Sequence, residues 1–166
     1  MTDPETLERL RLIADPKTLA TIEISVEDLT DPDARSEAIR ADHPAFDQAL
    51  GRGEDEVRVN GEPINVRLHF AMHDVVASQL VDDHPPDVYL TARRLLDAGY
   101  DRHEILHMLA GTIAEQIQAA LTERGHYDRE RHVAALNALP GSWEQQPTRP
   151  PLNRAERRAR PRHRPG

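Results

Sequence analysis

Helix-start signals punctuate this 166-residue sequence and restrict it to a mainly helical fold. Asp-Pro pairs at positions 3–4 and 31–32 place a capping side chain before proline, the residue best suited to the first helical turn. Leu7, Leu10 and Ile13 then follow at helical spacing on one face. The pattern predicts short helices from residue 4 onward, over 32–43 and over 45–50.

The middle of the chain predicts a hairpin followed by longer helices. Asn60-Gly61 supplies the positive φ angles of a tight turn between two very short strands within residues 56–64. Asp101, with Glu104 three residues later, forms a capping-box-like start for one of the helices that follow. We expect those helices over residues 66–81, 87–98, 102–124 and 128–139.

The predicted fold class is therefore mainly α, a small helical bundle with a minimal β-hairpin before the first histidine-bearing helix. We expect one helical domain over residues 1–144, with a three-helix, histidine-bearing core at 64–125. Residues 145–166 are rich in proline and arginine and have few apolar side chains, so we expect a disordered tail there.

Composition removes several classes of chemistry. The chain has no cysteine, which excludes disulfides, thiolate metal sites and cysteine nucleophiles, so a metal would need His, Asp, Glu or backbone oxygen ligands. No apolar run approaches the ~20 residues of a membrane span, and the N-terminal residues lack the apolar core of a signal peptide. We expect a soluble cytoplasmic protein without a membrane partner.

Two histidine pairs carry the strongest chemical signal. His69 and His73 are four residues apart, as are His103 and His107, and side chains at this spacing share one helix face. The second pair belongs to an H-E-x-x-H sequence, in which two histidines bind zinc and the glutamate, here Glu104, acts as general base.

The spacing between the pairs predicts a shared site. The separation along the sequence from His69 to His103 equals that from His73 to His107, and one predicted helix lies between the two histidine-bearing helices. Short loops make consecutive helices antiparallel, so the first and third helices should run parallel with their histidines at one height. Four imidazoles could then converge on a divalent metal ion, with zinc the favoured ion.

Other side chains are weaker candidates around this site. Asp74, His84 and Glu115 could be additional ligands or hydrogen-bond partners of the imidazoles. His126, His132 and His163 are predicted at solvent or packing positions. Histidines at helix starts can also be buried, hydrogen-bonded core residues, so a site without a metal is the competing interpretation.

The two histidine blocks also resemble a known family. The segments 65–73, 83–86 and 99–107 are similar to an uncharacterised bacterial domain-of-unknown-function family of short helical proteins, with the resemblance covering about residues 56–120. The family supplies no activity. The resemblance implies that His69, His73, His103, Glu104 and His107 belong to one site.

Three functions remain open from sequence. The first is a metal-binding helical protein that uses the two histidine pairs and is not an enzyme. The second is a zinc-dependent hydrolase in which Glu104 is the general base. The sequence lacks the downstream third ligand that is usual in such enzymes. If four histidines bound one ion, no coordination position would stay open for a substrate or water.

The third function is an interaction module built on the tail. Residues 149–166 carry a net charge of +6, whereas the preceding residues carry −14. The tail could therefore contact RNA, the ribosome or an acidic protein surface, although it lacks aromatic residues to stack on bases. Its candidate contact residues are Arg154, Arg157, Arg158 and Arg160.

Overall fold

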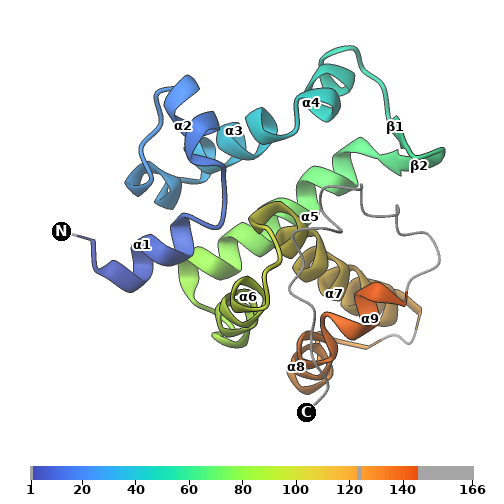
Figure 1. The fold of residues 1–166 in the computed structure, drawn as a ribbon. Helices are drawn as coiled ribbons and strands as arrows, with labels where there is room; N and C mark the ends of the chain where they lie inside the picture. Colours follow the sequence, from blue (N-terminus) through green and yellow to red (C-terminus); the bar gives the residue numbers. More distant parts are fainter. Residues whose placement is uncertain (1, 123–124, 146–166) are drawn as a thin grey trace. The chain divides into compact units, whose positions relative to one another are not determined.

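The computed structural model describes residues 2–122 and 125–145 (Figure 1). The chain falls into two compact units, Met1–Tyr89 and Leu90–Gly166, and the division lies within helix α6, Asp87–Asp97. Helices dominate both units and a single two-stranded hairpin accompanies them in the described part, which confirms the predicted fold class. Among the described residues, no helix has the length and apolarity needed to cross a bilayer.

The first unit opens with short helices whose starts follow the Asp-Pro signals. Asp3 caps α1 (Pro4–Leu10), Asp15 caps α2 (Pro16–Thr21) and Asp31 caps α3 (Pro32–Asp42), each through a side-chain oxygen that accepts a backbone N–H. A 3₁₀ turn, η1 (Glu27–Thr30), precedes α3. Helix α1 ends at Leu10 and a turn leads to α2, a break that the sequence analysis did not predict. Pro16 disfavours helical backbone at Asp15, which keeps the two helices separate.

The predicted hairpin joins these helices to the histidine-bearing one. Helix α4 (Pro44–Gly51) leads to β1 (Glu56–Val59), which pairs antiparallel with β2 (Glu62–Asn65). Asn60 and Gly61 both have positive φ angles at the turn, as the Asn-Gly sequence requires. The hairpin is largely exposed, and β1 contacts α4 while β2 leads directly into α5.

Helix α5 (Val66–Asp82) is the central element of the first unit. Asn65 caps it by accepting the backbone N–H of Leu68 at 2.9 Å. Helices α1, α3 and α4 pack against it, and its buried face includes Val76 and Leu80. The helix ends where Asp83 adopts a left-handed backbone conformation. The predicted range of 66–81 agrees within one residue.

The second unit is built around α7 (Arg102–Thr122), against which α8 (Arg129–Ala138) packs. Arg94 of α6 donates to the carbonyl oxygens of Leu139 and Leu136 at 2.7 and 3.0 Å, which satisfies acceptors at the end of α8. Helix α8 ends at Ala138, within one residue of its predicted end, and a short helix that the sequence analysis did not predict, α9 (Gly141–Glu144), follows Pro140.

Candidate metal centre

His69 and His73 share one face of α5, as their spacing predicts. The cap at Asn65 sets the start of the helix at Val66. His69 therefore lies in the first turn, and His73 lies about one turn after it. Their ring centroids are 4.8 Å apart, and His73 is buried while His69 is partly exposed. The sequence prediction is therefore confirmed for the position of this pair.

A third histidine, His43, joins them from the junction between α3 and α4. Its ring centroid lies 4.8 Å from that of His69 and 4.4 Å from that of His73. One ring nitrogen from each histidine lies within 4.8 Å of those of the other two. A cluster of histidines in the first unit could therefore hold a metal ion, and the sequence analysis had not singled out His43.

The hydrogen bond of His43 determines which nitrogen faces the cluster. Its Nδ1 lies 2.7 Å from the carbonyl oxygen of Ile39, one helical turn earlier in α3. A carbonyl oxygen can only accept, so Nδ1 carries the proton and donates it. In the neutral ring, the lone pair is then on Nε2, a buried atom. Metal-binding histidines commonly donate their second ring N–H to a carbonyl in this way.

Two phenylalanines surround the cluster. Phe46 of α4 stacks on His69, with ring centroids 4.0 Å apart and planes inclined by 11°. Phe70 of α5 stands edge-on to His43, with centroids 6.1 Å apart and an 89° angle. Both phenylalanines are buried. Such an apolar surround limits water and lowers the local dielectric around polar nitrogens.

His103 and His107 form a second pair on α7. Their ring centroids are 4.5 Å apart, and both side chains are partly exposed. Asp101 accepts the backbone N–H of Glu104 at 3.0 Å, which confirms the predicted helix cap. This pair belongs to the second unit, so its convergence with His69 and His73 remains a prediction.

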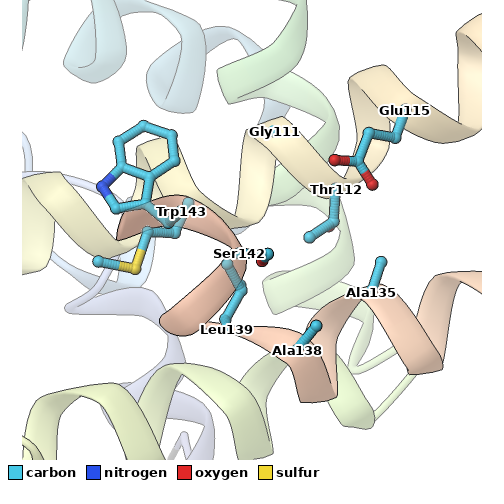
Figure 2. A pocket seen from close by; sticks show the side chains of 9 residues that line it. Gly111, Thr112, Glu115, Ala135, Ala138, Leu139, Ser142 and Trp143 are labelled. Carbon is cyan, nitrogen blue, oxygen red and sulfur yellow. The ribbon is translucent and has the colours of Figure 1, made fainter. Parts of the chain in front are cut away.

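The weaker candidates Asp74, His84 and Glu115 each line a groove or a cavity. Asp74 accepts a hydrogen bond from the Ser36 hydroxyl at 3.1 Å. Asp74 also lines an open groove of about 310 Å³, along with exposed His84 and four other residues. Glu115 is exposed and lines a cavity of about 60 Å³ in the second unit, near Thr112 and Ser142 (Figure 2).

The remaining histidines divide between packing and solvent. His132 is fully buried, and its Nε2 lies 3.1 Å from the Thr112 hydroxyl while its Nδ1 lies 2.9 Å from that of Tyr127. His126 is exposed. These positions agree with the sequence analysis. His163, the predicted disordered tail beyond residue 145 and the candidate contact residues Arg154, Arg157, Arg158 and Arg160 lie outside the described residues.

One family of known proteins shares the sequence pattern of this chain. The sequence profile of a family described as "Domain of unknown function (DUF1841)" matches residues 23–138, a span that contains His43 and both histidine pairs. The match confirms the resemblance inferred from the histidine blocks. No curated protein and no solved structure matches the chain.

Proposed function

We propose that this chain, which belongs to the DUF1841 family, binds a divalent transition-metal ion through His43, His69 and His73. The observation that carries the proposal is the convergence of three imidazoles from two separate parts of the first unit, with ring nitrogens within 4.8 Å of one another. The hydrogen bond from His43 Nδ1 to Ile39 adds support, because it leaves Nε2 as the ligating atom.

The donor set favours zinc over harder ions. Imidazole nitrogen suits zinc, copper, nickel and iron, whereas calcium and magnesium prefer oxygen ligands. Zn–N bonds of about 2.0–2.1 Å in a tetrahedral site place the nitrogens roughly 3.4 Å apart. The ring nitrogens now lie within 4.8 Å of one another, so side-chain rotation would have to bring them closer together when the ion binds.

The second histidine pair extends the proposal to a fuller coordination sphere. Zinc sites in proteins generally have four ligands, and three come from the first unit. His103 and His107 repeat the spacing of His69 and His73, on a helix predicted to run parallel to α5. We therefore propose that an imidazole of this pair is a further ligand, with Glu104 beside it.

The bound ion would have a structural effect on the first unit. His43 lies between α3 and α4, whereas His69 and His73 lie on α5, beyond the hairpin. An ion held by all three would cross-link these segments, which are distant in the sequence, and stabilise their packing. Metal-binding free energy then contributes directly to the stability of the fold.

The test measures metal content and affinity in untagged protein. Purified wild type should hold one equivalent of metal per chain, or take up one equivalent of added Zn²⁺. His43→Ala should lower the affinity by ~100-fold or more, because a structural zinc site of four ligands contributes ~10–16 kcal/mol, or roughly 3 kcal/mol for each ligand. His69→Ala repeats the test at a partly exposed ring.

His84→Ala is the matched control. His84 also precedes a proline, as His43 does, but its side chain is exposed. Its substitution should leave zinc affinity unchanged. Folded wild type that neither retains metal nor takes up added Zn²⁺ would contradict the proposal, as would equal losses in the His43 and His84 variants.

A further inference from the structure

We infer that the second unit holds a separate binding site for a small primary alkylammonium ion. The site is the cavity of about 60 Å³ that residues of α7, α8 and α9 line (Figure 2). None of the histidines proposed as metal ligands lines it, so the two sites can be tested independently. The polar groups at the rim, the size of the space and one glycine of α7 together select this class of ligand.

The rim of the cavity carries a negative charge. Glu115 is exposed, and its carboxylate makes no hydrogen bond or ion pair within the part of the chain that the structure describes. Figure 2 shows this carboxylate turned toward Thr112 and Ser142. The Thr112 hydroxyl already donates to the Leu109 carbonyl oxygen at 2.7 Å. A carboxylate only accepts hydrogen bonds, whereas an ammonium group only donates them, so the rim favours a cationic donor.

The interior of the cavity is apolar and small. Met108 and Leu139 are buried, and Trp143 contributes its indole ring to the wall. An engineered apolar cavity of about 150 Å³ holds one benzene molecule, so 60 Å³ admits about two or three non-hydrogen atoms. Aromatic rings also attract organic cations. A short alkyl chain can therefore lie inside the cavity with its ammonium group at the rim, beside Glu115.

Gly111, in the middle of α7, keeps the cavity open. Glycine is less favourable than alanine in a helix interior, so its presence there needs a structural reason. Apart from the backbone of α7 itself, a Cβ atom at this position would have Trp143 Cζ3 as its nearest neighbour among the described residues. That distance is 3.8 Å, an ordinary van der Waals contact. Close packing therefore does not require glycine, and the missing methyl group leaves space for a ligand beside the indole ring.

The experiment uses the only tryptophan of the chain as its reporter. Trp143 lines the cavity, so the full chain labelled with ¹⁵N has a single indole N–H signal to follow by NMR. Ethylammonium chloride is titrated at constant ionic strength, with ethanol as the neutral analogue of equal size and tetramethylammonium chloride as a larger cation. We expect a saturable shift with ethylammonium in the millimolar range, which is the affinity available to so few atoms. Ethanol should bind at least ~3-fold more weakly, and tetramethylammonium should give no saturable shift.

Three variants separate ligand selection from folding. Glu115→Gln keeps the size of the side chain and removes its charge, so it should weaken ethylammonium binding at least ~3-fold and leave ethanol binding unchanged. Glu130→Gln is the matched control, because Glu130 is an exposed carboxylate of α8 that does not line the cavity. Gly111→Ala places a methyl group in the cavity. It should abolish the saturable shift while the melting temperature stays equal or rises, since alanine favours a helix interior.

Each contrary result refutes a defined part of the inference. Equal binding of ethylammonium and ethanol, or equal effects of Glu115→Gln and Glu130→Gln, would show that the Glu115 carboxylate does not select the ligand. An ethylammonium response that survives Gly111→Ala would place the binding outside the cavity. If the indole signal of the wild type does not shift at all, the cavity is not a binding site for alkylammonium ions.

Discussion

Replacing Phe46 with leucine should weaken zinc binding by about 2- to 13-fold. Phe46 stacks on His69 with centroids 4.0 Å apart and an 11° inclination, a geometry that restricts the imidazole before any metal arrives. Leucine is also apolar, but it removes the aromatic face. The His69 ring then has to be ordered when the ion binds.

The magnitude follows from the interaction that is lost. An aromatic stacking pair contributes about 0.5–1.5 kcal/mol, and immobilising one side chain on binding costs a similar amount. Because a tenfold change in affinity corresponds to about 1.4 kcal/mol, losing about 0.5–1.5 kcal/mol of binding free energy weakens zinc affinity by about 2- to 13-fold. The same substitution should lower the free energy of unfolding by about 1–2 kcal/mol, because Phe46 is a buried residue.

Phe70→Leu is the matched control for this prediction. Phe70 is as buried as Phe46, but its ring stands edge-on to His43 and to His69, with interplanar angles of 89° and 71°. It should lose similar stability and change zinc affinity by less than about twofold, because its ring centroid lies 6.1 and 5.9 Å from those of His43 and His69, against 4.0 Å for Phe46 and His69, and dispersion weakens steeply with distance.

Two assays separate the effects. Competition with a chromophoric chelator measures zinc affinity, and thermal unfolding of the metal-free proteins measures stability. Equal affinity losses in the Phe46 and Phe70 variants would refute the reasoning, because general loosening of the core would then explain both. Unchanged affinity in Phe46→Leu would refute it as well.

Three further predictions concern other parts of the chain. Glu104→Gln should keep stoichiometric metal and cost at most ~0.5–2 kcal/mol of stability in thermal unfolding; any activity against a peptide and ester panel should fall by at least ~100-fold if Glu104 is a general base. Deleting residues 149–166 should change stability by less than ~0.5 kcal/mol and remove any salt-sensitive RNA binding measured by titration. Hydrogen bonds from the Thr6 hydroxyl and backbone N–H lower the pKa of Asp3 in the folded state, so Asp3→Ala should unfold at lower temperature than wild type at pH 7, and this difference should disappear as the pH falls through the lowered pKa.

The start of α5 shows what local sequence could predict. Asn65 accepts the Leu68 N–H, and the helix begins at Val66, as the predicted range of 66–81 has it. Once the helix start and the four-residue spacing are known, His69 and His73 must share a face. The hairpin turn was predictable for the same reason, because Asn-Gly has a local conformational preference that tertiary packing does not override.

Contacts between elements were beyond the sequence analysis. His43 was interpreted only as the end of a helix, because its partners lie on α5, beyond α4 and the hairpin. Its position depends on how α3 and α4 pack against α5, which no periodicity reports. The same applies to the hydrogen bond that Asp74 accepts from Ser36 of α3, because it joins two helices that are distant in the sequence.

The tautomer of His43, by contrast, has a local origin. A histidine at the C-terminal cap of a helix can donate a ring N–H to a carbonyl oxygen of the last turn. His43 does so to Ile39, which lies four residues earlier in α3. That hydrogen bond uses Nδ1 and directs Nε2 away from α3. The end of helix α3 thus sets the tautomer of His43. Tertiary packing sets which residues of α5 lie near its ring, namely His69 and His73. A metal centre in this unit requires both, which is why substitution of His43 tests the proposal more sharply than substitution within the more obvious pair on α5.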